Sequence, residues 1–285
     1  MKHIIVPVDF SEEALEGLNL AITIARKIPS KIEMVYVKKK SNDIFYITRE
    51  EETKNAKREF EKILKTYKSK VPENSELTYI IKEGKIFQEI VNQAHSFKDS
   101  FIVSSTHGAS GFEKFFIGSN TFKIIAATHK PVFTIRKAAC PNEINNIVLP
   151  IDTSIETRQK IPFTAELADY MGAKVHVIKV TNSDATEFKR KVELYGKQAI
   201  EYIEKYKLPY ETDYLTGSNI TDLTLEYADK VKADLVSIMT EQSVNFSGLV
   251  IGGNAQQMLN KSEIPVLTIS PKELYHKSFF KTQGY

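Results

Sequence analysis

The sequence has little cysteine, little net charge and no long apolar run. Its 285 residues include one cysteine, Cys140, which excludes an intramolecular disulfide framework and fits a reducing compartment. A formal net charge of +3 is too small to indicate nucleic acid or an anionic membrane as a partner. The first apolar run, residues 4–8, stops at Asp9 and is too short for a signal peptide or a membrane span. We therefore expect a cytoplasmic protein.

Several common functional motifs are also absent. The sequence has no Gly-Lys-Ser/Thr of a P-loop and no Gly-x-Gly-x-x-Gly after its first predicted strand. It shows no Ser-His-Asp pattern and no metal-ligand spacing. His107 lies in a loop without a patterned carboxylate, which is more typical of a structural or solvent-facing histidine than of a general base. The sequence therefore predicts no catalytic residue and no metal ligand.

The main pattern present is an internal repeat. Residues 3–11 return as residues 146–154, which sets Asp152 143 positions after Asp9. Later segments match at a smaller offset, with Gly252 134 positions after Gly118, so the second copy has lost about nine residues between its second and third strands. Copies of this size can each bury a core. We predict domains at residues 1–137 and 145–270, followed by a C-terminal tail at 271–285.

Each copy alternates predicted strands and helices. In the first copy, apolar runs predict strands at residues 4–8, 32–37, 77–81, 101–104 and 132–135. Ser11 is the predicted N-cap of a helix that reaches Ala25, and further helices are predicted at 50–68, 86–95 and 119–128. This alternation predicts an α/β fold of two tandem doubly wound domains, each a five-stranded parallel sheet with helices on both faces.

Two loops are predicted to meet at one edge of the first sheet. In such sheets ligands lie beyond the carboxyl ends of the strands, where the strand order reverses, and this brings together the loop at Asp9 and the loop at 106–118. Gly118-Ser119 begins a helix, and free N–H groups at a helix N-terminus favour an anion. On these features alone, a phosphate site and an ordinary glycine-containing loop both remain open.

Three motifs resemble the universal stress protein family. They are Pro7-Val8-Asp9-x-Ser11, Gly108-x9-Gly118-Ser119, and Lys-Pro-Val-x-x-Ile at residues 130–135. The resemblance spans both copies and implies a fold like that of the adenine nucleotide alpha hydrolases. The family's first loop glycine falls on Ser105, which departs from the pattern. If that position requires φ > 0, serine costs on the order of 1–2 kcal/mol; its hydroxyl could instead bond a ribose.

The resemblance also implies a ligand and the residues that hold it. The ligand is ATP, or AMP or ADP, with Mg or Mn beside a triphosphate. Asp9 is interpreted as a ligand residue and Asp152 as a turn residue. The implied site comprises Pro7, Val8 and Asp9 at the adenine and ribose end, the Val37 backbone at the base, Ser105, and Gly108, Gly118, Ser119, Asn120 and Thr121 at the phosphates.

The second copy matches this pattern poorly. Met239, Gln242 and Gly252-Gly253 stand at the positions of Ser105, Gly108 and Gly118-Ser119. We predict that this copy binds nucleotide weakly or not at all and serves as an intramolecular pseudo-dimer partner, paired through the last strands; a homodimer and an unknown protein partner remain possible. The expected function is a nucleotide-binding sensor or regulator in stress response. The alternatives are a slow ATPase or autophosphorylating protein that uses Ser119, and an interaction module that binds no nucleotide.

Overall fold

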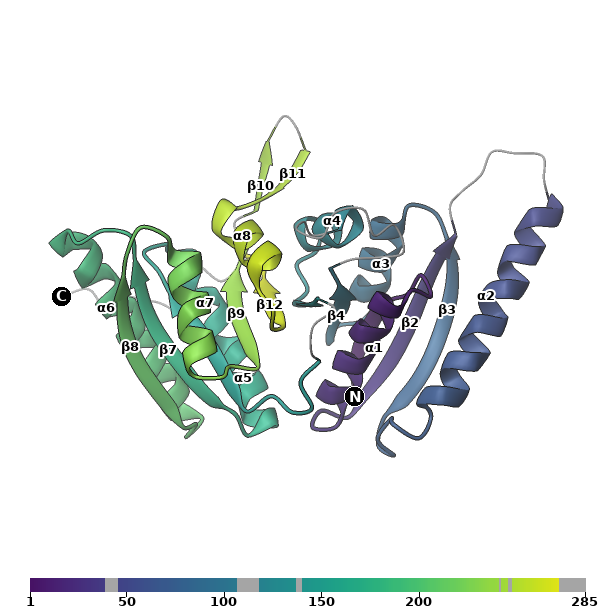
Figure 1. Cartoon of the computed structure of the whole chain (residues 1–285), viewed down its shortest axis with the longest axis horizontal. Helices are drawn as coiled ribbons and strands as arrows, with labels where there is room; N and C mark the ends of the chain where they lie inside the picture. Colours follow the sequence, from purple (N-terminus) through teal and green to yellow (C-terminus); the bar gives the residue numbers. More distant parts are fainter. Residues whose placement is uncertain (39–45, 107–117, 137–139, 241, 246–247, 272–285) are drawn as a thin grey trace. The chain divides into compact units, whose positions relative to one another are not determined.

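A computed structural model describes residues 1–38, 46–106, 118–136, 140–240, 242–245 and 248–271 (Figure 1). The chain divides into two compact units. One comprises Met1–Ile144 with Leu259–Val266, and the other comprises Asn145–Met258 with Leu267–Tyr285.

The first copy forms a parallel five-stranded sheet in the order β3-β2-β1-β4-β5. Because the order turns back between β1 and β4, this sheet has the reversal point that the sequence predicts. Right-handed crossovers place α1 and α2 on one face and α3 and α4, which contact each other, on the opposite face. The elements are β1 (Lys2–Pro7), α1 (Glu12–Ala25), β2 (Ser30–Lys38), α2 (Tyr46–Tyr67), β3 (Glu76–Glu83), α3 (Ile86–His95), β4 (Ser100–Ser105), α4 (Ser119–Ala127) and β5 (Val132–Ile135).

The start of this copy shows why the local sequence adopts these elements. Ile4, Ile5 and Val6 of β1 are fully buried, as expected for a strand covered on both faces. The Ser11 hydroxyl then accepts a hydrogen bond from the Ala14 N–H at 3.1 Å, which confirms the predicted N-cap of α1.

The second copy repeats the fold, with strand order β12-β9-β6-β7-β8. Its pairs β6–β7, β7–β8 and β6–β9 are parallel. The segment between the second and third strands covers residues 39–75 in the first copy and 182–209 in the second, which is nine residues shorter, as predicted. The elements are β6 (Asn146–Ile151), the 3₁₀ helix η1 (Glu156–Lys160), α5 (Ile161–Met171), β7 (Lys174–Thr181), α6 (Thr186–Lys205), β8 (Tyr210–Thr216), α7 (Ile220–Lys230), β9 (Leu235–Met239), β10 (Gln242–Asn245), β11 (Gly248–Ile251), α8 (Gly253–Lys261) and β12 (Val266–Ile269).

The sequence does not predict the hairpin in the second copy. Strands β10 and β11 pair antiparallel, with Gln242 opposite Ile251 (Figure 1). They lie between β9 and α8, at the place in the repeat that the glycine-containing loop occupies in the first copy. The corresponding segment of the first copy, residues 107–117, lies outside the described residues.

Residues 140–142, between the two predicted domains, pack against α1. The Thr23 hydroxyl donates to the Pro141 carbonyl at 3.0 Å, and Arg26 Nη1 donates to the Asn142 carbonyl at 3.0 Å. Cys140 is half-buried beside Thr23, and burial raises the pKa of its thiol. A raised pKa leaves less thiolate at neutral pH, so this cysteine is a poor nucleophile.

Candidate functional site

The carboxyl ends of β1 and β4 bring the two predicted loops to one edge of the first sheet. The strands pair in parallel, with His3 opposite Ser100. Beyond β4, the Thr106 N–H donates to the Ile135 carbonyl at 2.9 Å, and the Gly118 N–H donates to the Thr106 carbonyl at 2.5 Å. Gly118 is thus held directly at the end of β4, beside the crevice. Gly108 and His107 lie outside the described residues.

Helix α4 presents its N-terminus at this point. Gly118 is the N-cap residue, without a side-chain capping hydrogen bond, and no acidic residue stands in the first turn. Ser119 and Asn120 are exposed. The first N–H groups of a helix have no intrahelical acceptor, so this end has the positive partial charge that favours an anion.

Thr121 has a structural contact where a phosphate contact was expected. Its side chain is buried, and its hydroxyl donates to the Ser105 carbonyl at 2.8 Å. The Ser104 hydroxyl lies 3.2 Å from the Thr121 hydroxyl. Thr121 therefore ties α4 to the end of β4, and any phosphate contact would have to come from its backbone.

Ser105 lies at the end of β4 in an ordinary backbone conformation. It pairs with Ile135 of β5. It is not among the described non-glycine residues with positive φ, which are Phe10, Lys207 and Lys232. The energetic penalty considered for serine at a left-handed position therefore does not arise here. Ser105 is closely approached by helix α1. A Cβ added at Gly17 of this helix would lie 3.3 Å from the Ser105 backbone nitrogen.

The loop after β1 has the same turn in both copies. Asp9 Oδ1 accepts hydrogen bonds from the Ser11 N–H at 3.1 Å and the Ser11 hydroxyl at 2.5 Å. Asp152 Oδ1 accepts the matching pair from Ser154 at 2.7 and 2.5 Å. These contacts give both aspartates a turn-forming role, and they do not distinguish a ligand role for Asp9 from a structural role for Asp152. Pro7 is half-buried, while Val8 is buried and its N–H donates to the Val35 carbonyl at 3.0 Å.

A hollow of about 320 Å³ opens beside this loop. Phe10, with φ 64°, packs on Tyr36 with ring centroids 4.9 Å apart, and the neighbouring Val37 is buried in β2. The Tyr36 hydroxyl donates to Glu52 Oε1 at 3.0 Å, and burial together with Glu52 raises the pKa of Tyr36 to about 12. The walls are Phe10, Tyr36, Glu51, Glu52, Asn55, Ala56 and Glu59. Sequence reasoning missed this hollow, although Phe10 and Tyr36 stand at the ends of adjacent strands.

The region of the second copy that corresponds to the start of α1 contains a buried lysine. Lys160, 1% exposed, stands where the first copy has Gly17, and its ammonium donates to the carbonyl and the hydroxyl of Thr157, both at 2.9 Å. The Asp152 N–H donates to the same hydroxyl at 3.1 Å. Burial lowers the pKa of Lys160 to about 8, although Asp152 acts in the opposite direction. Sequence reasoning did not single out this lysine.

The described residues contain neither a cluster suited to a metal ion nor a helix suited to a bilayer. No group of three or more histidine, cysteine, aspartate or glutamate side chains in that part of the chain could hold a metal ion. None of its helices is long and apolar enough to cross a bilayer.

Known proteins resemble both copies. The model of the universal stress protein family matches residues 1–136 and 143–270. A universal stress protein of Methanocaldococcus jannaschii is 27% identical over 146 residues, which cover 48% of this chain and 82% of that protein. A solved universal stress protein from Archaeoglobus fulgidus covers 94% of this chain and 98% of its own, at 16% identity and a TM-score of 0.76. A functionally unknown protein from Pseudomonas aeruginosa PAO1 covers 95% and 93%, at 17% identity and a TM-score of 0.62. The chain therefore belongs to the universal stress protein family, with two of the family's domains in tandem.

Proposed function

We propose that the first copy binds one adenine nucleotide at the carboxyl edge of its sheet, as ATP with Mg or Mn or as AMP or ADP. The observation that carries the proposal is the position of Gly118, held by Thr106 at the reversal point of the strand order. From the strand order we infer that the exposed first turn of α4 lies at the same edge of the sheet as the loop at Asp9.

The distribution of charge determines the orientation in which the nucleotide is proposed to bind. The phosphates bind at the N-terminus of α4, where Ser119 and Asn120 are exposed and no carboxylate stands in the first turn. The hollow at Phe10 and Tyr36 is lined by three glutamates, which repel a phosphate. The base and ribose therefore bind at the Pro7–Asp9 end, with Ser105 at the end of β4 beside the ribose, and Gly108 is assigned to the phosphates together with Gly118.

The second copy is proposed to bind nucleotide weakly or not at all. It has Met239 and Gln242 at the first two loop positions, and Gly253 offers no hydroxyl where Ser119 stands in the first copy. Its loop region is a β-hairpin, and Lys160 with Thr157 fills the space under the Asp152 turn. We propose that it serves as the structural partner of the first copy.

The protein would then act in stress response as a sensor or regulator whose state follows the nucleotide it holds. One observation supports a slow ATPase or autophosphorylating protein as a second candidate: Ser119 presents an exposed hydroxyl at the proposed phosphate position. One solved universal stress protein is in complex with cAMP, but at 16% identity and a TM-score of 0.37 that likeness carries no part of the proposal.

The direct test measures the nucleotide released when freshly purified protein is denatured and identifies it by chromatography. We expect one adenine nucleotide per wild-type chain, none for Gly118→Val, and one for the matched control Gly252→Val in the second copy. Phosphate release above background, lost in Ser119→Ala, would favour the slow ATPase. If the wild type releases no nucleotide and takes up none at millimolar ATP and magnesium, the proposal fails and an interaction module becomes the better interpretation.

A further inference from the structure

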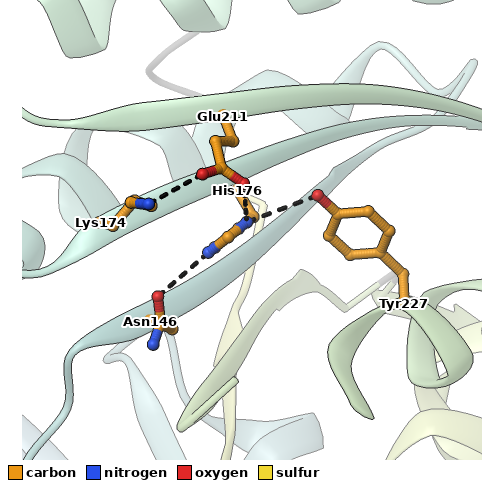
Figure 2. Close-up of polar contacts among 5 residues, drawn as sticks. All are labelled: Asn146, Lys174, His176, Glu211 and Tyr227. Atoms are coloured by element: carbon orange, nitrogen blue, oxygen red, sulfur yellow. Dashed lines mark hydrogen bonds and ion pairs between the residues drawn. The ribbon is translucent and has the colours of Figure 1, made fainter. Parts of the chain in front are cut away.

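A buried histidine connects α7 to the sheet of the second copy. His176 of β7 is 3% exposed and lies near the amino ends of the strands, the edge opposite the carboxyl ends (Figure 2). Asn146 and Lys174 begin β6 and β7, Glu211 of β8 pairs directly across from His176, and Tyr227 reaches the ring from α7.

The contacts of the ring define its neutral form. His176 Nε2 lies 3.1 Å from Asn146 Oδ1, an oxygen that only accepts, so Nε2 carries the proton. Nδ1 then has a free lone pair, and the Tyr227 hydroxyl, 3.4 Å away, donates to it. Glu211 Oε2 lies 3.6 Å from the same Nδ1 and cannot bond to it while both atoms are acceptors. Figure 2 shows both partners directed at this one nitrogen.

We propose that protonation of His176 controls the attachment of α7 to the sheet of the second copy. We call the hydrogen bond between the Tyr227 hydroxyl and His176 Nδ1 the latch. When Nδ1 takes a proton from solvent it becomes a donor. The ionised Glu211 carboxylate is a stronger acceptor for it than the neutral Tyr227 hydroxyl, so the new bond goes to Glu211. The Tyr227 hydroxyl then loses its acceptor on β7, and α7 loses this polar attachment to the sheet. Protonation thus replaces the contact of His176 with Tyr227 of α7 by a contact with Glu211 of the neighbouring strand β8.

The surrounding charges leave His176 as the group that titrates in mild acid. Lys174, 2.8 Å from Glu211, lowers the pKa of that carboxyl, so Glu211 stays ionised. Burial, with Asp213 and Glu211 adding to it, raises the pKa of Tyr227, so the phenol stays protonated. Burial and Lys174 lower the pKa of His176 below 6.5 while Glu211 raises it. Lys230 of α7 lies 5.9 Å from the Tyr227 ring centre and adds a positive charge beside this ring.

Loosening α7 would affect the part of the second copy that follows the hairpin. Asn219 Nδ2, at the N-cap of α7, donates to Gln257 Oε1 at 3.2 Å. The Thr221 hydroxyl of α7 donates to the Asn254 carbonyl at 3.3 Å, in the first turn of α8. These contacts couple α7 to α8 within the second copy.

The first copy lacks this histidine. Its residues at the positions of His176 and Tyr227 are Glu33 and Gln93, which hydrogen-bond to each other. A glutamate–glutamine pair offers no imidazole to exchange partners, so the latch belongs to the second copy and is independent of the nucleotide site proposed for the first.

Hydrogen exchange of the full chain tests the latch. We expect the protection factors of the α7 amides to fall about fivefold between about pH 7.5 and pH 5, the equivalent of one ordinary hydrogen bond of about 1 kcal/mol. His176→Gln should remove this dependence. The matched control His129→Gln, which changes an exposed histidine in the first copy, should keep it. Unchanged α7 protection in the wild type, or an equal fall in His176→Gln, would overturn the proposal.

A second variant keeps the test decisive if His176→Gln does not fold. Tyr227→Phe keeps the ring and removes the hydroxyl that stabilises the neutral imidazole, so the pKa of His176 measured by NMR should rise. The α7 amides should also be less protected at neutral pH than in the wild type. If neither the histidine titration nor the α7 protection changes, the Tyr227 contact does not hold the helix and the latch is wrong.

Discussion

Replacing Lys160 by methionine should stabilise the protein at neutral pH. The lysine is fully buried, and burial lowers its pKa from 10.5 to about 8. At about 1.4 kcal/mol per pH unit, that difference corresponds to about 3 kcal/mol of destabilisation while the ammonium is charged. Methionine has a similar length and no charge, but it leaves the Thr157 carbonyl without this donor, a loss of about 1 kcal/mol. The expected net gain is about 2 kcal/mol.

The sign of the pH dependence provides the sharper test. Because the pKa of Lys160 is lower in the folded chain, the unfolded chain holds more protons between about pH 8 and pH 10.5. The destabilisation is therefore fully present below pH 8 and disappears as the pH rises through this window. The advantage of Lys160→Met should shrink across the same window until the two proteins are equal or the wild type is slightly more stable.

Urea denaturation of the full chain at several pH values measures this difference. Hydrogen exchange of the β6 and β7 amides reports on the second copy by itself. Lys197→Met, which removes an exposed lysine on α6 of the same copy, should change stability by less than about 0.5 kcal/mol at every pH. If Lys160→Met destabilises the chain at neutral pH, the ammonium contributes more through Thr157 and Asp152 than it loses by burial, and the reasoning is refuted.

Three further substitutions test the packing of α1, its N-terminal cap and the burial of His176. Gly17→Ala places a Cβ 3.3 Å from the Ser105 nitrogen, so we expect a loss of about 1–3 kcal/mol in urea denaturation and less bound nucleotide; unchanged values for both would contradict this close packing. Ser11→Ala removes the cap that receives the Ala14 N–H and should cost about 1 kcal/mol in the same assay, whereas no loss would mean that the Asp9 turn alone starts the helix. Because the folded pKa of His176 is lowered, stability should fall as the pH drops below 6.5, and His176→Gln should lessen that fall in urea denaturation.

Local patterns were sufficient to predict the repeated elements of the fold. Helix α3 and strand β5 have the bounds that apolar spacing predicts, and the cap at Ser11 follows from residue type alone. Helix α2 begins at Tyr46, four residues before the prediction, because the charged residues 49–52 separate its first residues from the apolar stripe further along the helix. Side-chain burial was harder to predict. Nothing in the order of residues reveals that Thr121 bonds back to β4, because that contact depends on how α4 packs.

The buried lysine and the hairpin could not be predicted from local sequence patterns, for a different reason. A lysine is almost never fully buried, so a sequence argument assigns Lys160 to the surface. The hairpin forms from a stretch with no strong turn dipeptide, in a region that the repeat alone would align with a loop. Both features belong to the second copy, where comparison with the first copy is least informative.

The pattern of differences between the copies indicates what the duplication has kept. Both retain the Asp–Ser turn after the first strand and the parallel order around it, which are requirements of the fold. Thr157 and Lys160 replace Ala14 and Gly17 beneath that turn, and a hairpin stands where the first copy has its loop. In this space the buried ammonium of Lys160 donates to the Thr157 hydroxyl and carbonyl, and the hydroxyl also accepts from the Asp152 N–H. We therefore propose that the second copy keeps the scaffold of the domain, while the features suited to a nucleotide are confined to the first.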